Sequence, residues 1–164
     1  MSKDFYTQFI LPYAGIIIKI CRAYTDSEED FQDYYQEVCL QLWKSRENFK
    51  GDSKWSTWVY RISLNVSLSL LKKDKKVNKK SVELPDIDAG VPQDSNPFND
   101  ESLKLLYLAI KQLSELDRAI ILLYLEENSY QEIAEIMGLS SNNIGVKITR
   151  IKKKLKTLLD GKIY

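Results

Sequence analysis

Apolar side chains recur every three or four residues along two long parts of the chain, which is the spacing of amphipathic helices. In the N-terminal part this pattern predicts helices over residues 4–24, 28–45 and 54–72, packed as one bundle. In the C-terminal part it predicts helices over about 101–113, 115–126, 130–137 and 141–159. No stretch of any length alternates apolar and polar residues as a strand would. The pattern therefore predicts an all-α fold.

The periodic pattern stops between these two parts. Residues 73–100 contain three prolines and a glycine and show no apolar face. Such a composition is typical of a flexible linker. We therefore expect two small helical domains, residues 1–72 and 101–164, joined by a linker over 73–100.

The predicted helices of the first domain also indicate which side chains form its core. Phenylalanine, tyrosine, tryptophan and aliphatic residues fall on one side of each helix. The second helix is expected to bury Phe31, Tyr34, Tyr35, Val38 and Leu42, and the third to bury Trp55, Trp58, Val59, Ile62 and Val66.

The composition argues against an enzyme. Histidine is absent from all 164 residues, which removes histidine-dependent triads, histidine metal sites and the usual general base near neutral pH. Cys21 and Cys39 lie in apolar helical patterns without metal-ligand spacing, so we expect buried thiols in a reducing compartment. No glycine-rich phosphate loop is present. We therefore expect no catalytic residue, no metal and no cofactor.

Charge is distributed unevenly, although the net charge is only +1. Residues 26–37 carry six acids and no base, whereas 72–80 carry six lysines against one acid. Residues 145–164 carry seven bases against one acid. Two basic segments and one acidic segment indicate two nucleic-acid contacts and one basic protein partner. The N-terminus lacks a signal-peptide pattern and the longest apolar run, residues 15–18, is too short to span a bilayer, so we expect a cytoplasmic protein without membrane insertion.

The sharpest local motif lies near the C-terminus. Ser129 and Glu132 have the spacing of a capping box, and Gly138 stands where a helix ends on a left-handed residue. Ser140 or Ser141 then caps a second helix with lysines on its outer side. This order predicts a helix-turn-helix whose second helix enters the DNA major groove. A plain helical hairpin with a solvated lysine face is the alternative.

Three blocks, in order, resemble the extracytoplasmic-function (ECF) sigma factors of bacterial RNA polymerase. Residues 30–43 resemble their region 2.2, residues 55–65 resemble region 2.3, and residues 113–140, including Arg118, resemble region 4. The short linker leaves no room for the middle domain of larger sigma factors. The resemblance implies a sigma factor that binds core RNA polymerase and promoter DNA and is a monomer when free. Since many relatives are held by an anti-sigma factor, such a partner is also a candidate.

The resemblance also implies roles for individual residues. In the family, region 2.2 binds basic clamp helices of the large polymerase subunit, region 2.3 captures the melted minus-10 strand, and region 4 reads the minus-35 element. Of the two tryptophans in region 2.3, we expect Trp55 to be structural and Trp58 to meet bases. The implied polymerase contacts are Asp33, Gln36, Glu37 and Trp43; the minus-10 contacts are Trp58, Tyr60, Arg61, Asn65, Lys72 and Lys73; the minus-35 contacts are Asn142, Asn143, Lys147, Thr149, Arg150, Lys153 and Lys154.

The chain departs from the family at Gly145, where relatives commonly carry a basic residue. The glycine removes a cation and costs the helix about 1 kcal/mol relative to alanine; closer approach of the backbone to DNA is a hypothesis for its use. The main alternative function is a stand-alone helix-turn-helix regulator that does not enter polymerase. It gives no role to residues 31–43, which supply neither pocket chemistry nor heptads.

Overall fold

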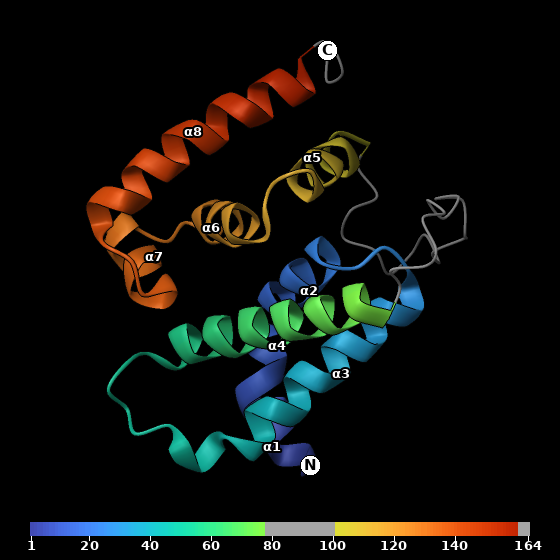
Figure 1. Cartoon of the computed structure of the whole chain (residues 1–164). Helices are drawn as coiled ribbons and strands as arrows, with labels where there is room; N and C mark the ends of the chain where they lie inside the picture. The colour runs from blue at the N-terminus through green and yellow to red at the C-terminus, as the bar shows by residue number, and fades with distance from the viewer. Residues whose placement is uncertain (78–100, 161–164) are drawn as a thin grey trace. The chain divides into compact units, whose positions relative to one another are not determined.

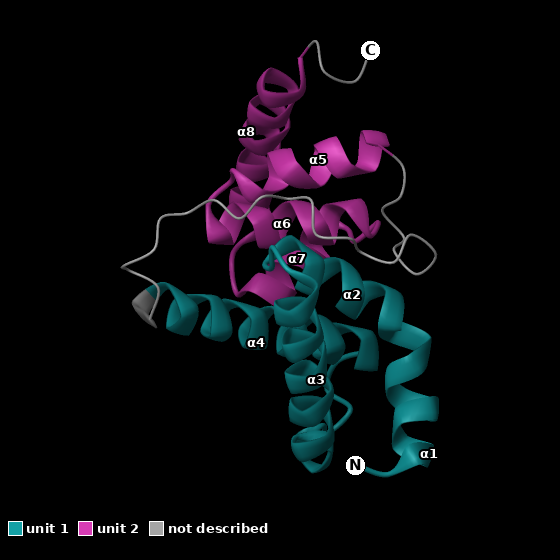
Figure 2. Ribbon diagram, turned by 90° about the vertical axis from the view of Figure 1, so that its right-hand side faces the viewer, with its two compact units in different colours: residues 1–87 teal, residues 88–164 magenta. Residues whose placement is uncertain are grey.

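The computed structural model describes residues 1–77 and 101–160. The chain divides into two compact units, residues 1–87 and 88–164, shown in different colours in Figure 2. All regular elements in the described ranges are helical (Figure 1), so the predicted all-α class with two helical parts is confirmed.

The boundary of the first part differs from the prediction. Helix α4 covers Trp55–Val77 and so continues beyond residue 72, into the segment predicted as linker. Lysines are good helix formers, and this stretch has neither proline nor glycine to end the helix. Asp74 also accepts a hydrogen bond from Tyr34 on the neighbouring helix. The rest of the predicted linker, residues 78–100, lies outside the described residues.

The N-terminal segment is not the single helix that was predicted over residues 4–24. Helix α1, Lys3–Phe5, passes into a π-helical turn over Tyr6–Ile10 and a 3₁₀ turn over Leu11–Tyr13, and only then does α2, Ala14–Ala23, begin. Pro12 explains the interruption, because proline has no N–H to donate and clashes with the preceding helical turn.

Helix α3, Glu28–Lys44, begins at Ser27, whose side chain accepts a hydrogen bond of 3.1 Å from the Asp30 amide. It packs against α2 and α4, which also contact each other. Its buried stripe agrees with the prediction except that Cys39 takes the place of Tyr35, which is partly exposed.

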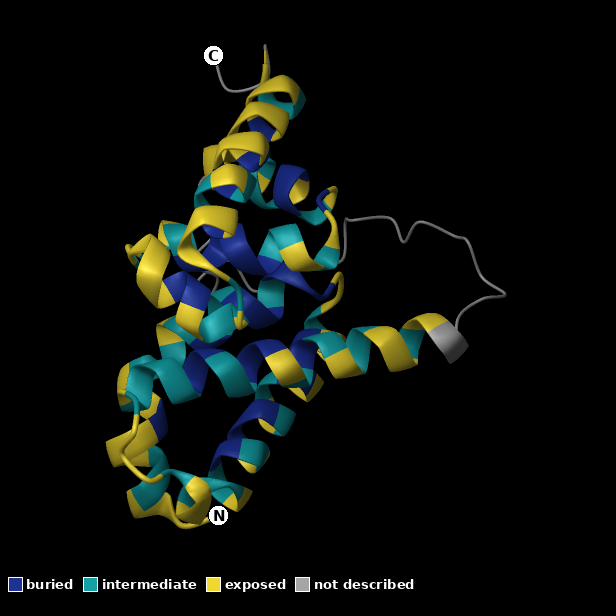
Figure 3. Ribbon diagram, turned by 60° about the vertical axis from the view of Figure 1, so that its left-hand side comes forward, coloured by how far each residue is buried: buried dark blue, intermediate teal, exposed yellow. Residues whose placement is uncertain are grey.

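The buried side of α4 is rotated from the predicted one. Ile62 and Val66 are partly exposed, whereas Ser63 and Ser67 are fully buried. Serine is small, so these positions let the neighbouring helices approach closely, a use that an apolar pattern does not reveal. The buried residues of α4 are Val59, Tyr60, Ser63, Leu64 and Ser67, part of the dark band along this helix in Figure 3.

Both cysteines are buried free thiols, as predicted. Burial raises the pKa of Cys21 to about 12 and that of Cys39 to about 11. Because the thiolate is the reactive form, both side chains are protonated and unreactive at neutral pH.

The second unit contains α5 (Glu101–Lys111), α6 (Glu115–Leu125), α7 (Tyr130–Met137) and α8 (Ser141–Leu159), close to the predicted ranges. Arg118 donates from Nη2 to the carbonyl oxygens of Lys111 and Leu113, at 2.7 and 3.3 Å, and so holds the turn after α5. Helix α8 buries Ile144, Ile148, Ile151 and Leu155 against the other three helices of the unit. Within residues 1–77 and 101–160, no helix combines the length and apolar character needed to cross a bilayer.

Candidate protein and nucleic-acid interfaces

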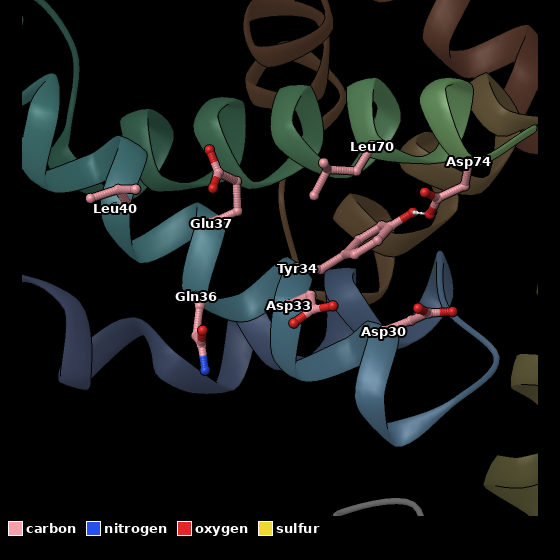
Figure 4. Close-up of a pocket in the computed structure, with 8 residues that line it drawn as sticks. All are labelled: Asp30, Asp33, Tyr34, Gln36, Glu37, Leu40, Leu70 and Asp74. Atoms are coloured by element: carbon pink, nitrogen blue, oxygen red, sulfur yellow. Dashed lines mark hydrogen bonds between the residues drawn. The ribbon is translucent and has the colours of Figure 1, made fainter. Parts of the chain in front are cut away.

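A groove of about 380 Å³ lies between α3 and α4, and we call it the acidic groove (Figure 4). Carboxylates dominate its wall, with one tyrosine and one amide, and two leucines supply its apolar part. Its residues are Asp30, Asp33, Tyr34, Gln36, Glu37 and Leu40 from α3, and Leu70 and Asp74 from α4.

Hydrogen bonds within the protein order part of this groove. Tyr34 donates from its hydroxyl to Asp74 Oδ2 at 2.9 Å, the dashed line in Figure 4, and Gln41 Nε2 donates to Glu37 Oε1 at 2.9 Å. Burial, and then the neighbouring carboxylate of Asp74, raise the pKa of Tyr34, so it remains a donor at neutral pH. The Glu37 carboxylate reaches toward α4, whereas the Gln36 amide points away from it (Figure 4).

The groove carboxylates are not neutralised by the described part of the chain. Among the described side chains, those of residues 1–75 and 101–160, neither Asp33 nor Glu37 has a lysine or arginine ion-pair partner. Asp33 is exposed and Glu37 is partly exposed. The groove therefore presents negative charge beside an apolar patch, which suits a basic helix or loop of another protein.

The structure brings three of the four predicted polymerase residues together in the acidic groove and places the fourth elsewhere. Asp33, Gln36 and Glu37 lie together in the acidic groove. Trp43 does not line it: Phe5 meets its ring edge-on at 5.2 Å and the Arg46 guanidinium lies 3.6 Å above it. Sequence reasoning missed Leu70 and Asp74, because only the alignment of α4 against α3 brings these two residues into the groove.

One face of α4 collects most of the predicted minus-10 residues. Trp58, Arg61, Asn65 and Lys72 follow each other by three, four and seven residues, which places them on one side of a helix. Asn65 and Lys72 are exposed, and Trp58 and Arg61 are partly exposed. Lys73 is exposed beside this face.

Tyr60 lies on the opposite side of α4 and is only 6 % exposed. Its predicted role as a base contact is therefore corrected: the side chain belongs to the core of unit 1. Tyr60 follows Trp58 by two residues, which is about 200° around a helix, so the two side chains cannot both face the same DNA strand.

The structure gives Trp55 the packing role expected of it, whereas the base contact expected of Trp58 stays a prediction. Trp55 donates from Nε1 to the Phe9 carbonyl oxygen at 2.8 Å, and its ring meets Phe5, Phe9 and Phe49 edge-on. Trp58 has a lesser packing role, with the Phe49 ring 5.8 Å away, and its buried Nε1 has no hydrogen-bond partner among the described residues. An unsatisfied indole N–H is uncommon, and it leaves Trp58 with a donor that the described part of the chain does not use.

Helices α7 and α8 form the predicted helix-turn-helix. Ser129 and Glu132 make both hydrogen bonds of the capping box, and Gly138 ends α7 at φ 70°, in the left-handed region. Ser140 accepts from the Asn143 amide at 3.2 Å and starts α8. Ile133 and Ala134 of α7 are buried beside Ile144 of α8, which sets the two helices against each other.

The outer face of α8 carries the predicted minus-35 residues. It lies opposite the buried isoleucines, and Figure 3 shows exposed residues along this helix. Lys147 is partly exposed at its margin. The exposed members of the predicted set are Asn142, Asn143, Thr149, Arg150, Lys153 and Lys154.

Two features at the edge of this face were not visible in the sequence. The neighbouring Lys152 donates from Nζ to the Tyr124 hydroxyl at 2.6 Å, which raises the pKa of Lys152 and ties it to α6. A Cβ atom added to Gly145 would meet the Tyr130 ring at 3.5 and 3.6 Å, an ordinary contact distance. The aromatic ring therefore occupies the space beside the glycine.

Two family models match the chain, each over one of its helical parts. The sigma-70 region 2 model matches residues 9–77, and the sigma-70 region 4 model matches residues 103–155. The ECF RNA polymerase sigma factor SigG of Mycobacterium tuberculosis is 29% identical over 174 residues, covering 90% of this chain and 46% of SigG. The ECF sigma-E factor of Escherichia coli K12 is 26% identical over 161 residues, covering 92% of this chain and 84% of that protein. The chain thus spans about half the length of SigG and most of sigma-E.

Two solved structures share the fold. The sigma factor RpoE of Bartonella quintana, crystallised with the anti-sigma factor NepR, gives a TM-score of 0.76 at 21% identity and covers 98% of this chain and 99% of its own. CnrH, in complex with the cytosolic domain of CnrY, gives 0.71 at 20% identity, with coverages of 98% and 91%. The two family models cover most of the chain in the order expected from the sequence, and we conclude that the chain belongs to the sigma-70 family as an ECF sigma factor.

Proposed function

We propose that this chain binds core RNA polymerase and directs it to specific promoters, and that it has no catalytic site of its own. The proposal rests on two features that occur in the same chain. Unit 1 has an acidic groove within the part matched by sigma-70 region 2, and unit 2 has a helix-turn-helix with a basic face within the part matched by sigma-70 region 4. We place its action in the cytoplasm, where the polymerase works.

For the polymerase contact we assign Asp33, Gln36 and Glu37. These side chains lie in the acidic groove, and the carboxylates have no ion-pair partner among the side chains that the structure describes. Basic side chains of the clamp helices would supply the missing charge, and Leu40 and Leu70 would meet their apolar parts. The polymerase contact expected of Trp43 stays a prediction. In unit 1 this side chain packs against Phe5 and Arg46.

For the melted minus-10 strand we assign the face of α4 with Trp58, Arg61, Asn65 and Lys72, together with Lys73. An aromatic ring can stack on an unpaired base, and an amide can donate to and accept from a base edge. Lysines and arginine hold phosphates without reading sequence. Tyr60 is left out because it is buried.

For the minus-35 element we assign the outer face of α8. Asn143 and Arg150 are proposed to touch base edges, whereas Lys153 and Lys154 meet phosphates, and Lys147 is long enough for either. Loss of a base contact costs about 1–3 kcal/mol at one position of the promoter, while loss of a phosphate contact weakens binding to all sequences. Alanine variants of Arg150 and Lys153, assayed on minus-35 point variants at two salt concentrations, separate these roles.

An anti-sigma factor is a further proposed partner. Both structural neighbours were solved in complex with another protein. RpoE was bound to the anti-sigma factor NepR, and CnrH was bound to the cytosolic domain of CnrY. We propose that a protein of this class holds the present chain away from polymerase, and that the free chain is a monomer.

The decisive experiment mixes the purified chain with core polymerase in the absence of DNA and measures binding. A sigma factor binds core polymerase directly, whereas a stand-alone regulator requires DNA or does not bind. Run-off transcription on random promoter fragments then reports whether the complex starts at defined sites.

A pair of charge reversals locates the contact. Asp33→Lys with Glu37→Lys should weaken core binding by at least tenfold without changing helix content. Asp4→Lys with Glu47→Lys makes the same change in net charge on unit 1, at exposed residues outside the groove, and should leave binding close to the wild-type value. Equal core affinity for both double variants would refute the groove assignment.

A further inference from the structure

Val146 lies in the middle of the outer face of α8, and no prediction from the sequence gave it a role. It follows buried Ile144 by two residues and precedes buried Ile148 by two, so it points away from the core of unit 2. Its side chain is 51% exposed, which makes it one of the most exposed large apolar residues in the described part of the chain.

The stability of the fold does not explain a valine at position 146. Valine and glycine both form helices less readily than alanine, and Gly145 and Val146 are consecutive in the first turns of α8. Because half of the Val146 side chain stays in water, it gains little from packing. Alanine at this position would serve the isolated helix better.

Thr149 extends the apolar surface. It is three residues after Val146, on the same side of the helix, and it is exposed. Its hydroxyl donates to the Gly145 carbonyl oxygen at 3.0 Å, within α8. Since its one proton is used in the helix, Thr149 offers a ligand only a methyl group and oxygen lone pairs.

The neighbours of this apolar pair are hydrogen-bonding groups suited to bases. Asn142 and Asn143 are exposed near the start of α8, and Arg150 is exposed next to Thr149. In the major groove, asparagine pairs with adenine and arginine with guanine, whereas the one apolar feature of a base edge is the C5 methyl group of thymine.

We propose that Val146, together with Thr149, recognises the C5 methyl group of thymine in the promoter element that α8 reads. The inference rests on the proposed function, because it requires α8 to lie in the major groove. It adds a specificity-determining residue, Val146, and states the base that this residue selects.

Replacing thymine by deoxyuridine tests the proposal, because it removes only the methyl group. The full-length chain with core polymerase first selects its element from a random duplex library. Each thymine of the selected minus-35 element is then replaced singly by deoxyuridine, and holoenzyme affinity is measured for wild type, Val146→Ala and Thr149→Ala.

We expect at least one replacement to weaken wild-type binding about fourfold, the effect of one buried methyl group. The same replacement should have little effect in Val146→Ala, which has already lost the contact. Lys153→Ala serves as the control: it should weaken binding generally and keep the full fourfold sensitivity to deoxyuridine.

Two results would overturn the inference while leaving the proposed function intact. One is a selected element that lacks thymine or is insensitive to every replacement; the other is a deoxyuridine effect of equal size in wild type and Val146→Ala. If the holoenzyme selects no sequence at all, the proposed function fails as well.

Discussion

The hydrogen bond between Tyr34 and Asp74 offers a sharp test of how the acidic groove is built. It joins α3 to the C-terminal part of α4 at 2.9 Å, across 40 residues of sequence. The change Tyr34→Phe removes the donor and keeps the ring, which is only 3% exposed, so no cavity forms. Any loss of stability therefore reports the hydrogen bond.

The expected loss follows from the chemistry of the acceptor. A hydrogen bond to a charged group contributes about 1.5–3 kcal/mol when buried. Asp74 is partly exposed, and water recovers part of this energy, so we expect Tyr34→Phe to lower the free energy of unfolding by about 1–2 kcal/mol. With a urea slope of about 1–2 kcal/mol/M, the midpoint should fall by about 1 M.

Tryptophan fluorescence makes the measurement specific to unit 1. All three tryptophans, Trp43, Trp55 and Trp58, lie within residues 1–87. Urea unfolding of the full chain followed by this signal therefore isolates the unit that contains the mutation.

A matched control is available in the neighbouring tyrosine. Tyr35 and Tyr6 share a hydrogen bond of 2.9 Å between neutral hydroxyls, so Tyr35→Phe should cost less, about 0.5–1 kcal/mol. A double-mutant cycle with Asp74→Asn should give a coupling energy near 1 kcal/mol between Tyr34 and Asp74. The reasoning is refuted if Tyr34→Phe unfolds at the wild-type midpoint, or if the cycle shows no coupling.

Three further predictions concern the α4 face, the glycine of α8 and the thiols. Trp58→Ala and Asn65→Ala should spare core binding but reduce open-complex formation about tenfold or more, as seen by permanganate footprinting, because stacking contributes about 1–3 kcal/mol per base; normal melting by both variants would exclude these contacts. Gly145→Ala should stabilise unit 2 by about 0.5–1 kcal/mol, since the new Cβ meets the Tyr130 ring at 3.5 Å or more without a clash; a lower melting temperature would contradict this, and weaker DNA binding at higher stability would support close backbone approach. At pH 8 the native thiols should react with a disulfide reagent far more slowly than in urea, because a pKa near 12 or 11 leaves almost no thiolate. The folded state holds the thiol protons more tightly than the unfolded state, so the free energy of unfolding should also fall as the pH rises above about 9. Equal thiol reactivity with and without urea would contradict this prediction, because it would show that the two cysteines are accessible in the folded protein.

The sequence by itself determined the helices of the C-terminal part and the helix-turn-helix. Strong local signals were sufficient there: the capping box at Ser129 and Glu132, the left-handed Gly138, and isoleucines at helical spacing in α8. Each of these depends on residues within one or two turns, so no knowledge of distant contacts is needed. The same holds for the acidic run of α3, since spacing alone places Asp33 and Glu37 one turn apart.

The tertiary structure decided which side of α4 faces the core. The apolar pattern favoured Ile62 and Val66 and left Tyr60 for DNA, whereas the fold buries Tyr60 and uses Ser63 and Ser67 where helices approach closely. Small polar residues carry no hydrophobic signal, so this choice depends on the shapes of α2 and α3. The acidic groove has the same origin: Leu70 and Asp74 join Asp33 and Glu37 only because α3 and α4 pack in one alignment, fixed in part by Tyr34. Contacts between residues forty positions apart are set by packing, and a periodic pattern read along one helix does not contain them.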